Sequence, residues 1–257
     1  MSFLTLNHIH HTYFTKESAS IALKDIHFTV DEGEFISLLG PSGCGKTTLL
    51  SIIAGLIKPT NGEVLIQGNR IDHTSSSIGY MLQQDYLFPW KTIEENIFIG
   101  LKILNILNEE TKAYALNLLD EMGLSQVRNA YPRQLSGGMR QRAALVRTLA
   151  TNPKILLLDE PFSALDYQTK LKLEDLVFNT LKQYKKTAIL VTHDIGEAIA
   201  MSNRIVILSA QPGQLNKIIC VPKALEELSP FHARQHELFP QLFQSIWKEL
   251  DYLESKK

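Results

Sequence analysis

Short apolar runs alternate along most of the chain with segments in which apolar residues recur at the helical period. This alternation is typical of an α/β domain, in which helices lie on the faces of a mainly parallel sheet. Each apolar run has the length of a buried strand. We therefore expect strands at Phe35–Leu39, Ile78–Leu82, Ile155–Leu158, Ala188–Val191 and Ile205–Leu208.

Two other segments indicate antiparallel pairing. Polar and apolar side chains alternate over Ile21–Val30, which is typical of a strand with one buried face. The Asn61-Gly62 dipeptide favours a turn into a strand at Glu63–Gln67. We expect an antiparallel β-section beside the parallel core.

Helical signals alone occupy residues 92 to about 130. Thr92 and Glu95 form a capping-box pattern, Asn108 can cap a second helix, and Gly123 can end it. We expect a helical subdomain at about residues 84–145, inserted into a main domain of residues 1–221.

A C-terminal extension of residues 222–257 is expected to be helical again, with a break at Pro240. Its apolar stripe either covers a face of the same subunit or contributes to a contact between subunits. The stripe consists of Phe239, Leu242, Phe243, Ile246, Leu250 and Leu253.

Composition narrows the function classes. Lys and Arg total 26 against 27 for Asp and Glu, so the net charge of −1 argues against a nucleic-acid binder that relies on charge. The longest apolar stretch, Leu49–Ile57, is much shorter than the roughly 20 residues that cross a bilayer. The N-terminal residues lack the pattern of a signal peptide, so we expect a cytosolic protein.

A complete GxxxxGK[ST] motif directly follows the predicted strand at Phe35–Leu39: Gly40-Pro41-Ser42-Gly43-Cys44-Gly45-Lys46-Thr47. A helix is expected from Thr48 to Leu56. This context predicts a phosphate-binding loop, whose backbone N–H groups and Lys46 hold phosphates while the Thr47 hydroxyl faces Mg²⁺. Cys44 is either a reactive thiol, its pKa lowered by Lys46 and the helix N-terminus, or a small residue that fills the loop.

Two carboxylates, Asp159 and Glu160, end the predicted strand at Ile155–Leu158. In a phosphate-transferring enzyme, Asp159 would hold Mg²⁺ through water and Glu160 would act as the general base toward the attacking water. A strand that ends in two acids is common by itself, so this hypothesis depends on the phosphate-binding loop.

A second glycine pair lies in the run Leu135-Ser136-Gly137-Gly138-Met139-Arg140-Gln141-Arg142. With the phosphate-binding loop, it resembles the LSGGQ signature of ATP-binding subunits of ABC transporters, with Met139 in place of the usual Gln. Ser136, Gly137 and Gly138 before a helix provide a second anion site. The resemblance implies a P-loop NTPase fold of the ABC type and a head-to-tail dimer, in which the signature of one subunit closes over the ATP held by the other.

The same resemblance assigns roles to two further segments. Gln83 resembles the Q-loop glutamine that senses Mg²⁺ and the attacking water, with Gln84 as an alternative register. Ser163-Ala164-Leu165-Asp166 resembles the D-loop that bridges the two sites of the dimer.

Two ring side chains complete the resemblance. His193 resembles the switch histidine that contacts the γ-phosphate. Tyr13 lies where the family keeps an aromatic side chain that stacks on adenine; Phe14 is the alternative, and an ordinary core aromatic is another.

The run Asp85-Tyr86-Leu87-Phe88-Pro89-Trp90 is similar to the corresponding segment of the nitrate, sulfonate and taurine importer group, which also includes carriers of thiamine pyrimidine precursors. The functional interpretation is a socket of Leu87, Phe88 and Trp90 for a short helix of the membrane permease. The alternative is that these side chains only pack the helical subdomain.

The resemblance therefore implies an ATP- and Mg²⁺-dependent ATPase subunit that powers import of a small solute: a sulfonate, taurine, nitrate or a pyrimidine-like compound. It would act as a homodimer at the cytoplasmic face of the cell membrane, with permease subunits and a solute-binding protein and without nucleic acid. The alternative is the ATPase of an exporter or a lipoprotein-release complex. A DNA-repair member is disfavoured because too few residues separate Lys46 from Leu135 to form a long coiled coil.

Overall fold

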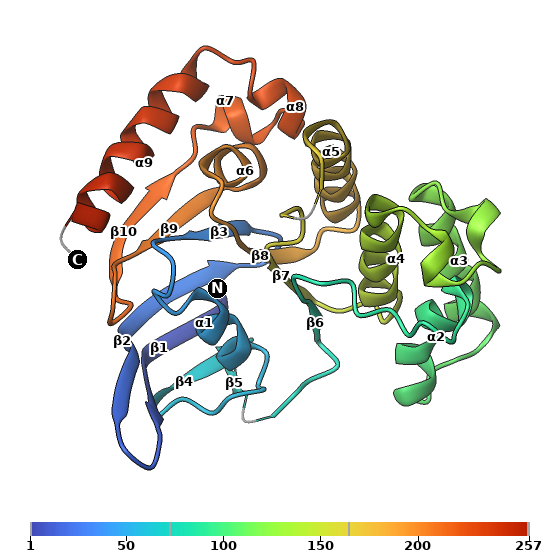
Figure 1. The fold of residues 1–257 in the computed structure, drawn as a ribbon, viewed down its shortest axis with the longest axis horizontal. Helices are drawn as coiled ribbons and strands as arrows, with labels where there is room; N and C mark the ends of the chain where they lie inside the picture. The colour runs from blue at the N-terminus through green and yellow to red at the C-terminus, as the bar shows by residue number, and fades with distance from the viewer. Residues whose placement is uncertain (1, 72, 164, 256–257) are drawn as a thin grey trace. The chain divides into compact units, whose positions relative to one another are not determined.

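The computed structural model describes residues 2–71, 73–163 and 165–255 (Figure 1). The chain divides into two compact units. The first unit contains residues 1–75 and 178–257, and the second contains residues 76–177. Strands alternate with helices in both, so the predicted α/β class is confirmed.

An antiparallel sheet of four strands forms one part of the first unit. Its order is β2-β1-β4-β5, and it confirms the expected antiparallel section. The strands are β1 (Ser2–Phe14), β2 (Ala19–Asp31), β4 (Asn61–Ile66) and β5 (Asn69–Arg70).

Strand β1 was not predicted, although it lies between β2 and β4. Leu4, Leu6 and Ile9 are fully buried, and the register shifts between Leu6 and Ile9 and again before His11. These irregularities move the buried side chains out of strict alternation, which removes the period-two signal from the sequence.

The first unit also contains four strands in the order β10-β9-β3-β8. Strand β3 (Phe35–Leu39) is parallel to β8 (Thr187–Val191) and to β9 (Arg204–Leu208), and all three match the predicted strands to within one residue. The antiparallel strand β10 (Leu215–Cys220) was not predicted, because its side chains are partly or fully exposed.

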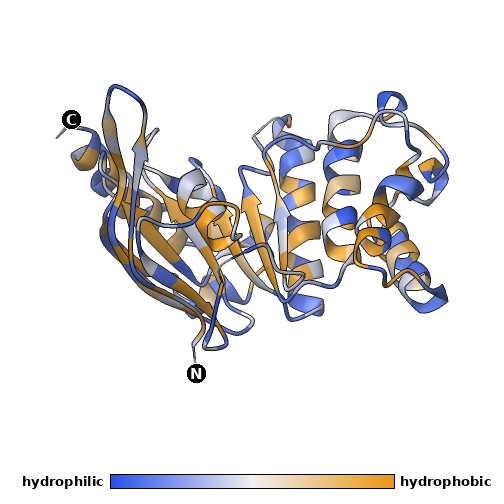
Figure 2. Ribbon diagram, turned by 90° about the horizontal axis from the view of Figure 1, so that it is seen from below, coloured by the Kyte–Doolittle hydropathy of each residue, from blue (hydrophilic) through white to orange (hydrophobic). Residues whose placement is uncertain are grey.

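The helices of the first unit flank these strands. Helix α1 (Lys46–Ile53) contacts β2 and β8, and α6 (Ile195–Met201) packs on β3. Helices α7 (Lys223–Glu226), α8 (Pro230–Ala233) and α9 (Leu238–Ser255) pack around α6 (Figure 1). Hydrophobic residues run along the strands, while the connecting loops are hydrophilic (Figure 2).

Helix α9 continues through Pro240, so the expected break is wrong. Proline is tolerated there because Pro240 lies in the first turn, where backbone N–H groups have no partner within the helix. The apolar stripe packs on its own subunit: Ile246 and Leu253 are buried against residues that include Ile199 and Ala233, and the rest of the stripe packs around them.

The second unit contains two parallel strands and three main helices. Strand β6 (Ile78–Met81) pairs with β7 (Ile155–Asp159), and α4 (Gly137–Ala150) packs against α2 (Ile93–Ile103) and α3 (Glu109–Glu121). Short 3₁₀ turns lie at Ser125–Val127 and Pro132–Gln134. Helix α5 (Tyr167–Gln183) begins in this unit and ends in the first.

The predicted helix ends are confirmed. The Thr92 hydroxyl accepts from the Glu95 N–H, and the Glu95 carboxylate accepts from the Thr92 N–H at 2.8 Å. Asn108 caps α3 in the same reciprocal way, and Gly123 follows its end with a positive φ of 65°. Within the described ranges, every helix is too short or too polar to cross a bilayer.

Candidate functional site

The P-loop, the GxxxxGK[ST] motif from Gly40 to Thr47, joins the buried strand β3 to helix α1 in the first unit. Gly40 and Gly45 have φ values of 156° and 91°, which favour glycine. A Cβ on Gly40 would lie 2.7 Å from the Leu208 carbonyl oxygen, and one on Gly45 would lie 2.7 Å from the Leu23 side chain. The backbone thus forms a tight turn whose N–H groups and helix start are suited to phosphate oxygens.

Lys46 places a cation inside this loop. Its Nζ donates to the carbonyl oxygens of Gly40 at 2.7 Å and Pro41 at 3.1 Å, and only 8% of the residue is exposed. Ser42 and Thr47 are exposed, so a phosphate or a metal ion can reach their side chains. The glycines, the ammonium group and the hydroxyls together fit a triphosphate with a hard cation such as Mg²⁺.

Cys44 is buried beneath the loop, with its Sγ 3.7 Å from Lys46 Nζ. Burial raises the pKa of the thiol, and this effect exceeds the opposing influence of Lys46. The interpretation of Cys44 as a reactive thiol is therefore wrong, and the space-filling interpretation holds.

Iodoacetamide should modify Cys220 at least tenfold faster than Cys44 at pH 8. Only the thiolate reacts; burial both shields Cys44 and keeps its thiol protonated as the pH rises toward the raised pKa. Cys220, which is exposed on β10, is the internal control. Peptide mass spectrometry measures both rates, and equal labelling of the two cysteines would contradict the buried geometry.

A cleft of about 290 Å³ adjoins the loop and is lined by Tyr13, Lys46, Thr47 and Thr48, among others. The Tyr13 hydroxyl lies 3.2 Å from Thr48 Oγ1, and its ring meets the edge of His11 at 4.6 Å. Phe14 is 73% exposed and is not part of the cleft. The structure thus brings Tyr13, rather than Phe14, to the loop.

His193 follows the carboxyl end of β8, which is parallel to β3. The carboxyl ends of parallel strands lie at one edge of a sheet, so His193 and the P-loop share an edge of the first unit. Asp194 caps α6 by accepting from the Glu197 N–H at 3.1 Å, and its own N–H donates to Thr192 at 3.0 Å. These bonds fix the loop while the imidazole stays exposed.

Asp159 and Glu160 lie at the carboxyl end of β7 in the second unit. Asp159 is 6% exposed and accepts a hydrogen bond from the Tyr80 hydroxyl at 3.4 Å. Gln83 Nε2 donates to Glu160 Oε2 at 3.3 Å, so the side chain of Gln83 reaches the predicted base. Glu160 has a φ of 46°, a conformation that costs energy for a residue with a side chain and is common at functional sites.

The signature residues begin helix α4. Ser136 is its N-cap, with Oγ accepting from the Met139 N–H at 3.3 Å, and Gly137 is exposed at the first position. Gly138 is buried, and a Cβ there would lie 2.7 Å from the Thr169 methyl group. An exposed hydroxyl and glycine at the start of a long helix form a surface suited to an anion.

Three side chains of α4 bind residues 83–86. The sequence did not predict these contacts. Gln141 Nε2 donates to the Gln83 carbonyl at 3.2 Å, and Arg140 Nε donates to Asp85 at 3.0 Å. Arg147 donates to the carbonyls of Asp85 and Tyr86, both at 2.7 Å. The sequence signal for these contacts is the polar face of α4, which is too general to identify partners.

The 85–90 segment is held from its other side by Asn96, which is fully buried. Asn96 Oδ1 accepts from the Phe88 N–H at 2.7 Å, while its Nδ2 donates to the Phe88, Lys91 and Thr92 carbonyls. Leu87 is buried, whereas Trp90 is 69% exposed beside Phe88. The alternative of complete packing inside the helical subdomain thus applies to Leu87 and not to Trp90.

The D-loop segment is described except for Ala164, which lies outside the described residues. Asp166 accepts from the Thr169 N–H at 3.1 Å and thereby caps the start of α5. Ser163 Oγ donates to the Glu160 carbonyl oxygen at 3.0 Å. This segment is therefore tied directly to the predicted base.

The geometry divides the site residues between the units. The first unit brings together Tyr13, His193 and the P-loop, and the second brings together Gln83, Asp159, Glu160 and the signature.

Comparisons with known proteins identify the family of the chain. The model of a family described as ABC transporter matches residues 23–163. The chain is 63% identical, over 100% of its length and 99% of the relative, to the uncharacterized ABC transporter ATP-binding protein YtlC of Bacillus subtilis. It is 40% identical, over 93% of both chains, to the aliphatic sulfonates import ATP-binding protein SsuB of Bacillus cereus. It is 37% identical, over 88% of its length and 85% of the relative, to the nitrate import ATP-binding protein NrtD of a Synechocystis species.

A solved structure extends the similarity to three dimensions. The dimeric post-hydrolysis state of the ATP-binding cassette MJ0796, bound to ADP and Pi, matches with a TM-score of 0.74 at 34% sequence identity. The match covers 85% of this chain and 99% of the cassette.

Proposed function

We propose that this chain, which belongs to the ABC transporter family and is an ATPase, powers the import of a small solute through a membrane permease. Import is supported by the sulfonate and nitrate import proteins to which the chain is similar. The solute is a sulfonate, taurine, nitrate or a pyrimidine-like compound. Sulfonates and nitrate are named in those relatives, and the other two come from the importer group that the 85–90 segment resembles.

The first unit holds the nucleotide. The ring of Tyr13 stacks on adenine, the backbone from Gly40 to Thr48 wraps the phosphates, and Lys46 balances their charge. Thr47 of this unit and Asp159 of the second unit would hold Mg²⁺, which would withdraw charge from the transferred phosphoryl group. His193 contacts the γ-phosphate from the same edge as the P-loop.

The second unit provides the base. Glu160 accepts a proton from the attacking water, and Gln83, which donates to that carboxylate at 3.3 Å, orients both the water and the base. The hydrogen bond from Gln83 orients the carboxylate before the substrate arrives, so less reorganisation is needed during the reaction.

Two copies of the chain form the complete site. Ser136, Gly137 and Gly138 present their anion-binding surface to the γ-phosphate held by the P-loop of the second copy, and Asp166 bridges the two sites. The dimeric cassette bound to ADP and Pi supports this arrangement. The homodimer lies peripherally at the cytoplasmic face of the cell membrane, bound to permease subunits that a solute-binding protein supplies.

The observation that carries the coupling role is the exposed side chain of Trp90, which lies beside the half-buried Phe88 on a segment held by hydrogen bonds. Asn96 holds the backbone of the 85–90 segment at Phe88, and Arg147 holds it at Asp85 and Tyr86. Gln83, two residues before the segment, contacts Glu160. A permease helix that packs on Trp90 is thereby connected to the base through a few hydrogen bonds.

Trp90→Ala should reduce solute uptake by the reconstituted complex about tenfold or more, because an exposed tryptophan is typical of the residues that dominate an interface. ATP hydrolysis by the isolated subunit should stay within about twofold of wild type, since Trp90 does not contact the nucleotide residues. Trp247→Ala, which removes a tryptophan that is 58% exposed on α9, is the matched control. Equal losses of uptake and ATPase activity in Trp90→Ala would disprove the coupling role.

A further inference from the structure

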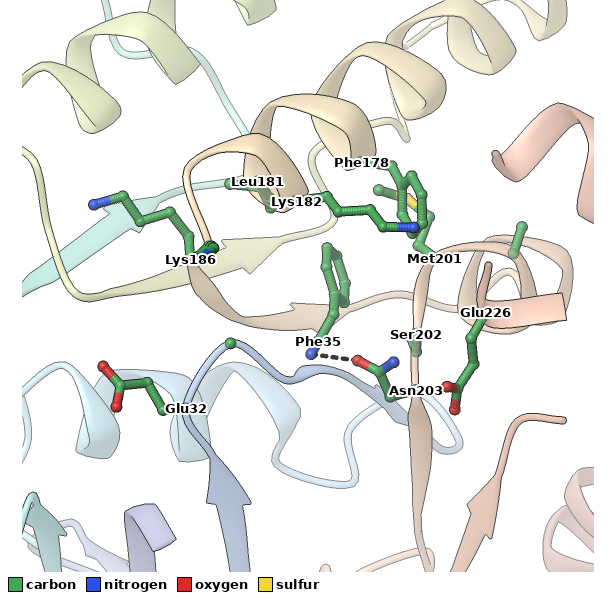
Figure 3. Close-up of a pocket in the computed structure, with 13 residues that line it drawn as sticks. Glu32, Phe35, Phe178, Leu181, Lys182, Lys186, Met201, Ser202, Asn203 and Glu226 are labelled. Atoms are coloured by element: carbon green, nitrogen blue, oxygen red, sulfur yellow. Dashed lines mark hydrogen bonds between the residues drawn. The ribbon is translucent and has the colours of Figure 1, made fainter. Parts of the chain in front are cut away.

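A cavity of about 430 Å³ lies in the first unit, away from the P-loop (Figure 3). It opens at the amino ends of β3 and β9, whereas the P-loop follows the carboxyl end of β3. Five strand residues at about 3.3 Å each separate the two places by roughly 16 Å. The cavity is therefore a separate feature from the nucleotide cleft.

The inner wall of the cavity is apolar. Phe35, Leu181, Ala200 and Met201 line it and are buried, and the half-buried ring of Phe178 completes it. The volume lies within the range of small-molecule pockets, which are typically apolar with a few polar groups at fixed places. An apolar ligand body would gain affinity here by leaving water.

Three lysines also line the cavity. Lys182 extends over the ring of Phe178, with Nζ 5.4 Å from the ring centroid (Figure 3). Lys185 and Lys186 are the other two. Burial lowers the pKa of Lys186, as expected for an ammonium group that has lost part of its hydration. Two carboxylates, Glu32 and Glu226, line the cavity as well, so three ammonium groups leave a positive excess.

A fixed amide adds a hydrogen-bond donor. Asn203 Oδ1 accepts from the Phe35 N–H at 2.8 Å, which sets the orientation of the amide and leaves the opposite Nδ2 as the donor atom on the cavity wall. The dashed line in Figure 3 marks this bond. An apolar chamber with an oriented amide and three lysines in its lining matches a ligand that is apolar at one end and negatively charged at the other.

We propose that this cavity is a binding site for a small amphipathic anion, an organic sulfonate or carboxylate whose apolar body enters between Phe35, Phe178 and Met201 while its charged group meets Lys182. The site is independent of the nucleotide cleft and of the proposed transport role. Its occupant contacts the start of the strand that carries the P-loop and the end of α6, which follows His193.

Three probes that share one body test the charge preference: hexane-1-sulfonate, hexan-1-ol and hexylammonium, titrated into the full-length protein by ligand-observed NMR. For a ligand of this size we expect a Kd of about 1 mM for the sulfonate. The alcohol should bind about threefold or more weakly, and the ammonium more weakly still. Octane-1-sulfonate should bind several-fold more tightly than hexane-1-sulfonate, because each buried methylene adds affinity.

Variants test the location. The double variant Lys182→Glu, Lys185→Glu should bind hexane-1-sulfonate about tenfold more weakly and hexylammonium more tightly. Lys248→Glu, a reversal on the exposed face of α9, is the matched control and should bind as wild type. Lys46→Ala should also leave the sulfonate affinity unchanged, which separates this cavity from the P-loop.

Three results would overturn the proposal. These are equal affinities for the three six-carbon probes, wild-type sulfonate affinity in the Lys182→Glu, Lys185→Glu variant, and no saturable sulfonate binding below about 10 mM. The probe comparison uses the unmodified protein, so it tests the charge preference of the cavity even if a charge reversal disturbs folding.

Discussion

Glu160→Gln should reduce the rate of ATP hydrolysis at least a hundredfold while ATP still binds. A positioned general base typically contributes about 10²- to 10⁴-fold, and an amide of the same shape cannot accept the proton of the attacking water. The backbone at Glu160 and its contact with Gln83 tolerate glutamine, because only one oxygen is replaced. Phosphate release under saturating MgATP measures the effect.

The same variant should accumulate as an ATP-bound dimer in size-exclusion chromatography, since hydrolysis no longer reopens it. Glu110→Gln, which removes an exposed carboxylate from the first turn of α3, is the matched control and should behave as wild type. More than a tenth of wild-type activity in Glu160→Gln would show that another group acts as the base.

Lys46→Ala should weaken ATP binding about tenfold to a hundredfold and leave almost no hydrolysis. Hydrogen bonds to a charged group contribute about 1.5–3 kcal/mol each, and this ammonium is held inside the loop by the Gly40 and Pro41 carbonyls. Lys46→Arg should fail as well, because a planar guanidinium does not fit a position that is only 8% exposed.

A fluorescent ATP analogue measures the affinity, and circular dichroism confirms that the variants are folded. The control is Lys58→Ala, which removes an exposed lysine beyond the end of α1 and should bind ATP as wild type. A Kd for Lys46→Ala within threefold of wild type would remove Lys46 from the phosphate site.

The parts of the fold that could be predicted are those whose signal is local. Strands β3 and β7 are uniformly buried, so each appears in the sequence as a continuous apolar run. Thr92 and Asn108 are caps whose partners lie three residues away. By contrast, β1 and β10 were missed because bulges or exposed side chains remove their pattern.

The candidate site likewise contains residues with a local sequence signal and contacts without one. The sequence motifs and the family resemblance suggested Lys46, Gln83 and Glu160, because each lies in a short segment that can be read locally; their roles stay predictions. The burial of Cys44 depends on how the loop turns over it, and the bonds from Asn96 and Arg147 to the 85–90 segment join residues far apart in the chain. Such contacts result from tertiary packing, which no local window contains.

Mixing two inactive variants tests whether two chains share each ATP site. Lys46→Ala disables the P-loop, and Ser136→Arg blocks the signature surface at the start of α4. A mixed dimer keeps one site with both halves intact. Random exchange in the presence of ATP should therefore restore about a quarter of the wild-type hydrolysis rate, while each variant alone stays inactive. A mixture no more active than its separate components would contradict the shared site.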